Sequence, residues 1–192
     1  MKLKKLILFL SILLFILLPY HTLAGDNDTD VSDLPIRERI YVGGYVGLQF
    51  GTITAIIVSP TIAYRFTNRL TSGLGATYQY YRDSGFSVFG NGQQSTIITS
   101  IYGGNLFARY TITPQIFAQT EFEAMNLDSR IGSPLDNLEG RYWEFNYFAG
   151  GGYRAALSPR TFLNIIVLWN FNKDSQIHNQ NPVIRLGVDV RL

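Results

Sequence analysis

The sequence predicts an all-β protein, an eight-stranded antiparallel up-and-down transmembrane β-barrel, from three observations. After residue 39, eight segments alternate between an apolar face and a small or polar face, the period of β-strands. Charged residues make up only 16% of the chain, against roughly 25% in soluble domains. Aromatic residues reach 14% and Gly numbers 18, a composition that favours strands and tight turns over helices.

The first 24 residues have the three parts of a secretory signal peptide. Lysines supply the positive start, residues 6–18 are apolar apart from one serine, and we expect cleavage after Ala24. The alternative is a membrane anchor helix, which needs about 20 apolar residues, more than precede Pro19. The sequence therefore predicts export of residues 25–192.

The exported part begins with an acidic, polar stretch at residues 25–39, which predicts a flexible periplasmic tail. Loss of the leader's lysines brings the formal net charge of +2 close to neutral, so we expect no nucleic-acid partner. The chain has no cysteine, which excludes disulfides and thiolate metal sites.

The first four predicted strands share one pattern. Residues 40–50 place Ile, Val and Leu opposite Tyr, Gly and Gln. Residues 56–67 alternate likewise, with Pro60 predicting a bulge or local break. Residues 70–81 oppose Leu, Ala and Tyr to Thr, Gly and Gln, and residues 98–110 oppose Ile, Leu and Tyr to Thr, Asn and Arg. In each strand we assign the apolar set to the outside.

The last four predicted strands show the strongest contrast between an apolar face and a polar face. Residues 116–125 set Ile, Ala and Phe against Gln and two Glu, and residues 142–154 set Trp, Phe and Tyr against Glu, Asn and Arg. Residues 162–172 place Leu, Ile, Val and Trp on one side and several Asn on the other. Residues 184–192 alternate Ile, Leu and Val with Arg, Gly and Asp.

The connections match a barrel whose two ends both lie in the periplasm. Short turns near Thr67, Thr113 and Ser158 alternate with loops at residues 82–95, 127–140 and 173–182, and only the outer connection near Gly51 is short. A soluble sandwich would carry more Lys and Glu on its polar face, and a lipocalin-like barrel would reverse the two faces. Both alternatives fit the sequence less well than a membrane barrel.

Two sets of strand residues are the candidate site residues. An aromatic girdle at the membrane interfaces is predicted for Tyr64, Tyr80, Tyr110, Trp143 and Trp169. A lumen charge network is predicted for Arg65, Arg109, Glu121, Glu123, Glu144, Arg154, Arg185 and Asp189. Because an eight-stranded barrel is just wide enough for side chains to fill, we expect these charges to satisfy one another and close the lumen. The alternative is a narrow gated ion path.

The C-terminal residues resemble the β-signal read by the outer-membrane insertion machinery, with Arg185, Gly187, Val190 and Leu192 at its defined positions. Leu192 departs from the usual terminal aromatic residue. The stretches 41–50, 63–81 and 101–122 also resemble the outer-membrane β-barrel family widespread in Bacteroidota-type bacteria. The family resemblance implies the fold, and the β-signal resemblance implies the insertion machinery as partner and an outer-membrane location.

We expect neither an enzyme nor a bound cofactor or metal. Some small barrels that modify lipids need a histidine beside a serine and a carboxylate. Outside the leader only His178 is available, and its place in a loop predicts a solvated side chain. The expected role is structural or surface-binding, with outer-membrane lipid and a ligand or protein partner at the loops; the alternative is a narrow pore or a transport component.

Overall fold

The computed structural model describes residues 31–49, 53–87, 94–131, 140–178 and 181–192. The predicted signal peptide and the first residues of the predicted tail, 25–30, lie outside the described residues. Within the described part, no helix is long and apolar enough to cross a membrane.

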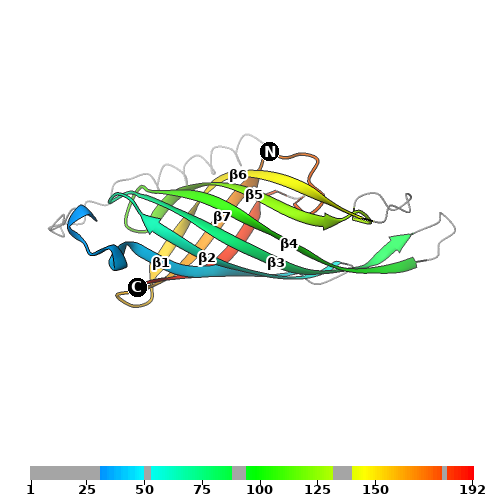
Figure 1. The fold of residues 1–192 in the computed structure, drawn as a ribbon, viewed down its shortest axis with the longest axis horizontal. Helices are drawn as coiled ribbons and strands as arrows, with labels where there is room; N and C mark the ends of the chain where they lie inside the picture. The colour runs from blue at the N-terminus through cyan, green and yellow to red at the C-terminus, as the bar shows by residue number, and fades with distance from the viewer. Residues whose placement is uncertain (1–30, 50–52, 88–93, 132–139, 179–180) are drawn as a thin grey trace, which may run out of the picture.

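Eight strands form one closed barrel in the order of the chain, and every neighbouring pair runs antiparallel (Figure 1). The strands are β1 (Ile40–Gln49), β2 (Ile53–Arg65), β3 (Leu70–Ser87), β4 (Gln94–Thr111), β5 (Ile116–Asp128), β6 (Arg141–Ala156), β7 (Thr161–Asn170) and β8 (Val183–Arg191). Pairing of β1 with β8 closes the barrel. The predicted eight-stranded antiparallel barrel is confirmed.

The side chains alternate between the outer surface and the lumen as predicted. On β7, Ile165, Val167 and Trp169 are exposed on the outside, whereas Asn164 and Leu168 are buried in the lumen. An outer surface of large apolar side chains around a lumen of buried Asn, Gln, Glu and Arg is the arrangement of a membrane barrel, because lipid surrounds the wall.

Aromatic side chains gather toward both ends of this outer surface. The structure places the predicted girdle residues on it, Tyr64 and Tyr110 near the short turns and Tyr80, Trp143 and Trp169 toward the long loops. Aliphatic side chains lie between these two groups, among them Ile62, Leu74, Leu106, Val167 and Val188, and the rings of Phe122 and Tyr147 lie beside Leu106. We call the two ends the short-turn end, which holds residue 40 and the C-terminus, and the loop end.

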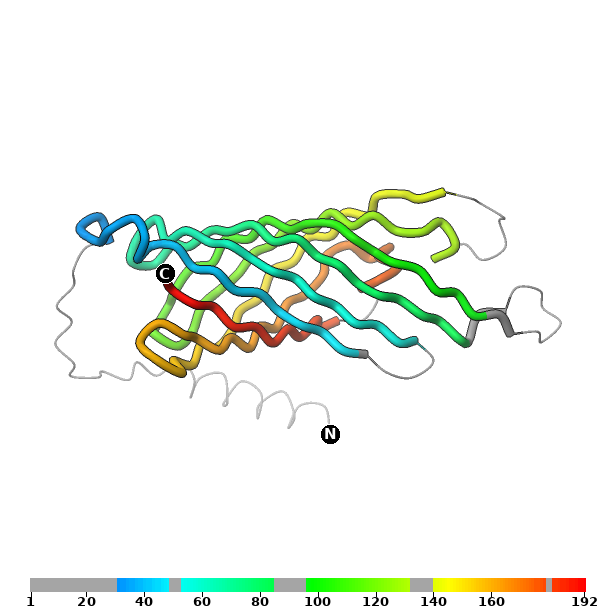
Figure 2. Tube along the Cα trace, turned by 60° about the horizontal axis from the view of Figure 1, so that its bottom comes forward, coloured from blue at the N-terminus to red at the C-terminus, as the bar shows by residue number. Residues whose placement is uncertain are grey.

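At the loop end, the strands on one side of the barrel extend farther than those on the other side. Strands β3 and β4 each have 18 residues, whereas β1 has 10 and β8 has 9. Figure 2 shows β3 and β4 continuing beyond the ends of β1 and β8. Since about 9–11 residues span a bilayer, β3 and β4 extend well past the membrane.

The long β3–β4 hairpin corrects the prediction of a loop over residues 82–95. Residues 82–87 and 94–95 are strand, and pairing continues past a register shift between Asp83 and Phe86. The Gly, Ser and Asn content suggested a loop, but cross-strand pairing continues regardless of this composition. Pro60 does interrupt the β2–β3 pairing, since Ser59 and Pro60 have no partner in that ladder.

The chain before β1 forms two short 3-10 helices, Val31–Asp33 and Ile36–Arg39, at the short-turn end. The backbone N–H of Val31 donates to Asn68 Oδ1 in the β2–β3 turn at 3.0 Å. Arg39 donates to the hydroxyl of Tyr64 at 3.3 Å. This part of the segment predicted to be a flexible tail is therefore bonded to the barrel.

Candidate functional site

Asp189 on β8 is the centre of the ion cluster nearest the short-turn end. Its Oδ2 atom accepts hydrogen bonds from Arg109 Nη1 at 2.9 Å and from Arg154 Nη2 at 3.2 Å. The side-chain amide of Asn164 donates to the same oxygen at 2.9 Å. One carboxylate thus compensates the buried guanidinium of Arg109 and the partly buried guanidinium of Arg154.

Arg185 lies closer to the loop end. It forms ion pairs with Glu121 and Glu123, two carboxylates on the lumen face of β5. Its Nη1 atom is 2.5 Å from Glu121 Oε1, and its Nη2 atom is 3.3 Å from Glu123 Oε2. The ring centroids of Tyr45 and Phe148 lie 4.5 and 5.1 Å from the guanidinium carbon. These rings restrict access of water to the cation and attract its charge.

Neutral side chains connect the two ion clusters. Arg109 Nε donates to Gln119 at 3.1 Å, and the Gln119 amide donates to Glu121 at 3.2 Å. Asn105 donates to the same carboxylate at 2.6 Å. The result is a continuous column of hydrogen bonds inside the barrel. We call it the polar column, and it consists of Asn105, Arg109, Gln119, Glu121, Glu123, Arg154, Asn164, Arg185 and Asp189.

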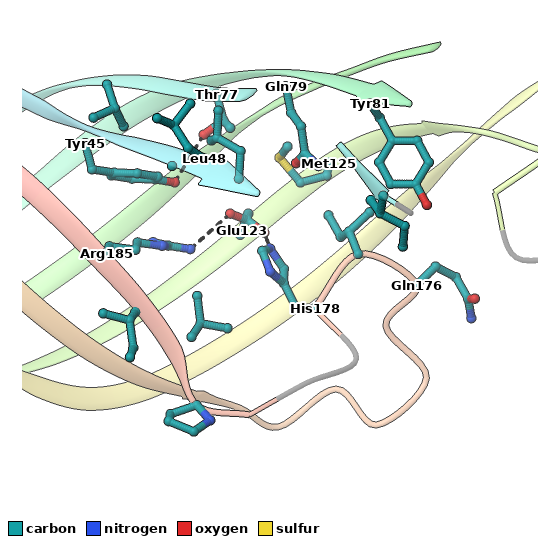
Figure 3. Close-up of a pocket in the computed structure, with 18 residues that line it drawn as sticks. Tyr45, Leu48, Thr77, Gln79, Tyr81, Glu123, Met125, Gln176, His178 and Arg185 are labelled. Carbon is teal, nitrogen blue, oxygen red and sulfur yellow. Dashed lines mark hydrogen bonds and ion pairs between the residues drawn. The ribbon is translucent and has the colours of Figure 1, made fainter. Parts of the chain in front are cut away.

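The segment between β7 and β8 folds into the loop-end mouth. His178 Nε2 lies 2.9 Å from Glu123 Oε1, which extends the polar column (Figure 3). Ser175 Oγ donates to Glu144 Oε1 at 2.6 Å, and the backbone N–H of Gln176 donates to the other oxygen at 2.8 Å. These three contacts fasten the segment to the lumen wall.

The structure contradicts the expectation of a solvated His178. The side chain is only 13% exposed, and its ring meets Phe148 edge-on with the centroids 5.3 Å apart. The prediction was wrong because the segment turns inward, a direction decided by contacts with Glu123 and Glu144, which lie far away in the sequence.

The predicted lumen charges do not all form ion pairs with one another. Arg65 lies at the short-turn end and donates to the carbonyl oxygens of Thr67 and Asn68 in its own turn. Glu144 bonds neutral groups, including the Asn146 amide at 3.0 Å, instead of an arginine. The inward Asn and Gln residues that bridge the ion clusters were not singled out from sequence, although their position on the polar face of each strand was visible.

The lumen is filled in its short-turn half. Phe117, Phe148, Ile166 and Leu168 are buried against one another beside the polar column. Phe117 lies toward the short-turn end, and the cluster continues past mid-barrel to Leu168, which pairs with Val183. The void among the polar-column residues measures about 20 Å³, room for about one water molecule.

A cavity of about 380 Å³ occupies the loop-end half. Figure 3 shows Arg185, Glu123 and His178 along one side of it, with Tyr45 and Thr77 facing them from the opposite wall. Toward the mouth the lining becomes apolar, with Ile53, Ile57, Tyr81, Met125 and Ile177. The lining also includes the polar side chains of Gln79 and Gln176, and the volume lies in the range of small-molecule sites, about 300–1,000 Å³.

The neighbouring mouth wall is fixed by its own contacts. Asp128 accepts hydrogen bonds from Arg130 at 2.6 Å and from Thr99 at 3.0 Å. The hydrogen bonds with Asp128 raise the pKa of Arg130, which lies outside the strands. The guanidinium of Arg141 lies 4.6 Å from the ring centroid of Tyr102. These contacts connect β4, β5 and β6 to one another at the loop end.

Among the residues that the structure describes near the mouth, Ser175, His178 and the neighbouring carboxylates do not form a hydrolytic triad. Ser175 Oγ donates to Glu144 and accepts from the backbone N–H of His178, while the His178 ring bonds Glu123 instead. In a Ser-His-acid triad the serine hydroxyl bonds the ring nitrogen of the histidine. Among the described residues, no group of three His, Asp or Glu side chains is placed to hold a metal ion.

The residues of the C-terminal insertion signal have separate places in the fold. Arg185 lies in the polar column, whereas Val190 and Leu192 face outward. Gly187 faces the lumen where β1 and β8 meet, and a Cβ there would lie 2.7 Å from the Gly44 carbonyl oxygen. A larger residue would push the two strands apart.

No family model matches the chain, and no curated protein matches it. The resemblance to the Bacteroidota-type barrel family therefore stays an expectation. Among solved structures, the outer membrane protein Ail of Yersinia pestis is 12% identical, with a TM-score of 0.47, over 80% of this chain and 98% of Ail. The N-terminal β-barrel domain of Pseudomonas aeruginosa OprF is 12% identical, with a TM-score of 0.42, over 79% of this chain and 93% of that chain. A de novo designed transmembrane β-barrel is 13% identical, with a TM-score of 0.40, over 81% of this chain and 96% of that chain.

Proposed function

We propose that this protein is an outer-membrane barrel that is closed to ions and binds a small ligand in the cavity at its loop end. The single observation that carries the proposal is the contrast within the lumen. A filled and hydrogen-bonded half lies beneath a cavity of about 380 Å³. A pore needs both halves open, whereas a binding site needs only one.

The outer-membrane location rests on the wall and on the two ends of the sequence. The lipid-facing side chains of the eight strands are predominantly apolar, as expected for a protein surrounded by hydrocarbon. The leader at residues 1–24 and the insertion signal at Arg185, Gly187, Val190 and Leu192 support export and assembly by the barrel-insertion machinery. The loop end then faces the outside of the cell, where surface partners are met.

The polar column supports the closed state. Each charge within it has an opposite charge or an amide in hydrogen-bonding distance. Breaking such buried pairs costs several kcal/mol, so thermal opening of an ion path is rare. The pore alternative requires the arginines and carboxylates to separate, and the enzyme alternative requires a different orientation of His178.

Planar-bilayer recording tests the closed lumen. We expect the purified protein to insert without conductance steps. The matched variant carries Arg109→Ser with Asp189→Ser. These substitutions remove one charge of each sign and replace two larger side chains in the tightly packed part of the lumen. We expect it to conduct. Regular conductance steps from the unaltered protein would overturn the closed lumen.

Cell fractionation tests the location. We expect the protein in the outer membrane, and we expect unheated and boiled samples to migrate differently in gels because folded barrels resist detergent. Recovery as a soluble periplasmic protein without a heat-dependent shift would contradict the proposal.

A further inference from the structure

The seam that closes the barrel is incomplete at the loop end. Pairing between β1 and β8 runs from Tyr41–Arg191 to Val46–Leu186 and stops there. Residues 47–49 of β1 and 183–185 of β8 are strands, and the structure describes all six residues. They pair with β2 and β7 on their other sides, but they have no ladder partner across the seam.

This gap lies at the level of the membrane. Leu48 and Ile184 flank it and face outward, with 64% and 65% of their surfaces exposed. Ile184 pairs with Val167, and Trp169 lies two residues farther toward the loop end. An interfacial aromatic residue thus lies beyond the gap, so the gap opens to the outer part of the hydrocarbon layer.

The cavity reaches this gap. Its lining includes outward-facing Val46, Leu48 and Ile184 as well as inward-facing Tyr45 and Arg185. A cavity that only opened to the mouth would not be bordered by lipid-facing side chains. Unpaired backbone groups at a lipid-facing edge are costly, which favours a polar group or water in the gap.

The polar groups in the cavity indicate which kind of lipid headgroup could bind there. Arg185 and Glu123 are already paired with each other, and Glu123 also bonds His178. A charged headgroup would have to break this arrangement or remain unpaired in a buried site. The hydroxyls of Tyr45 and Thr77 bond only neutral partners, and they suit an uncharged headgroup that carries hydroxyl or ester oxygens.

We propose that the gap between β1 and β8 is a lateral portal, through which a single-chain amphiphile with an uncharged, hydroxyl-bearing headgroup enters the cavity from the membrane. The headgroup binds among Tyr45, Thr77 and His178, and part of the acyl chain lies against Leu48 and Ile184. The cavity volume of about 380 Å³ fits a headgroup and part of a chain, with the remainder in the bilayer. This inference identifies the ligand class of the proposed binding site and rests on that function.

Contact quenching of tryptophan fluorescence tests the proposal in lipid vesicles. The background carries Trp143→Phe and Trp169→Phe, which removes both tryptophans of the chain. One reporter is Tyr81→Trp in the cavity, and the matched reporter is Phe117→Trp in the filled half. The probe is a monoacylglycerol with bromine on its acyl chain, and the unaltered protein, whose tryptophans face lipid, controls for partition of the probe.

We expect the probe to quench the Tyr81→Trp reporter and to leave the Phe117→Trp reporter unquenched. The same brominated chain in lysophosphatidylglycerol, which has one acyl chain and an anionic headgroup, should quench the Tyr81→Trp reporter much less. No quenching at Tyr81→Trp, while the unaltered protein is quenched, would overturn entry of the amphiphile. Equal quenching by both probes would overturn the uncharged headgroup.

A reversible crosslink tests the route. The chain has no cysteine, so Leu48→Cys with Ile184→Cys introduces a unique pair across the gap. We expect oxidation of this pair to abolish quenching at the Tyr81→Trp reporter and reduction to restore it. Val42→Cys with Val190→Cys crosslinks the paired part of the seam and should leave quenching unchanged. Quenching that persists with the upper crosslink formed would overturn the portal.

The Gly47→Leu substitution is expected to close the gap between β1 and β8 without a crosslink. A Cβ at Gly47 would lie 3.2 Å from the flexible end of Ile57, so the larger side chain enters the cavity beside the gap. We expect loss of most quenching at Tyr81→Trp, and unchanged quenching would count against the portal. Quenching of the Phe117→Trp reporter would instead show that the short-turn half is open. That result would contradict the proposed closed lumen, but it would leave the portal proposal standing.

Discussion

The two halves of the lumen are built on the same eight strands, yet one is filled and the other is hollow. In the short-turn half, inward positions carry large side chains such as Phe107, Arg109, Phe117 and Arg154. In the loop-end half, several inward positions are small, as with Gly47 and Thr77. Inward glycines also occur in the filled half, where Gly73 and Gly152 accommodate the rings of Phe107 and Phe117, so the fit between large and small inward residues decides where the lumen is filled.

The largest expected effect comes from the ion cluster of the filled half. Asp189→Ala leaves Arg109 and Arg154 without their common carboxylate, and we expect a loss of about 3–5 kcal/mol in the free energy of unfolding. Urea unfolding in lipid vesicles measures it. Asp174→Ala, in the exposed part of the β7–β8 segment, should stay within about 0.5 kcal/mol. Equal losses would contradict the role of the cluster.

The next effect concerns the wall that surrounds both halves. Val167→Arg places a cation in hydrocarbon, because Val167 faces outward near the middle of the wall, and should cost about 2–4 kcal/mol. Thr161→Arg, on the same face of β7 at the short-turn end, should cost about 0–1 kcal/mol. The same urea titration distinguishes them, and a harmless Val167→Arg would mean that this face is not in lipid.

A matched pair of isoleucines compares the halves directly. Ile166→Phe adds volume in the filled half and should cost about 1–3 kcal/mol, since the packing there has no space for it. Ile57→Phe adds the same volume at the cavity wall and should cost much less. Thermal unfolding in detergent provides the comparison, and a larger cost at Ile57 would reverse the assignment of the two halves.

The smallest effect tests the segment that covers the cavity. His178→Ala removes the bond to Glu123 and the contact with Phe148, and should cost about 1 kcal/mol. We expect faster proteolysis of the β7–β8 segment in intact vesicles but still no conductance, because the filled half is unchanged. Gln176→Ala is the control and should leave the cleavage rate as it is. A conducting His178→Ala variant would show that His178, and not the polar column, closes the barrel.

Sequence alternation was sufficient to predict the barrel and the direction of the strand side chains. The period of two depends only on local backbone geometry, so residues such as Val167 and Asn164 could be assigned to opposite faces. The break at Pro60 was equally local, because proline has no N–H to donate to a ladder.

Partners within the lumen could not be predicted in the same way. Arg109 and Asp189 are 80 positions apart, and their contact depends on the register of every strand between them. The same holds for the inward turn of His178 and for the end of the β1–β8 ladder at Val46. These features arise from closure of the whole barrel, which no short stretch of sequence encodes.

The accessibility of two substituted cysteines tests the central contrast most directly. In the cysteine-free chain, Ile57→Cys lies at the cavity wall and Ile166→Cys lies in the filled half, and both replace an inward isoleucine. N-ethylmaleimide, which dissolves in water and in lipid, reaches a hollow space by either route. We predict rapid modification at Ile57→Cys and negligible modification at Ile166→Cys in the folded protein. Equal rates at the two positions would contradict a closed half beneath a binding cavity.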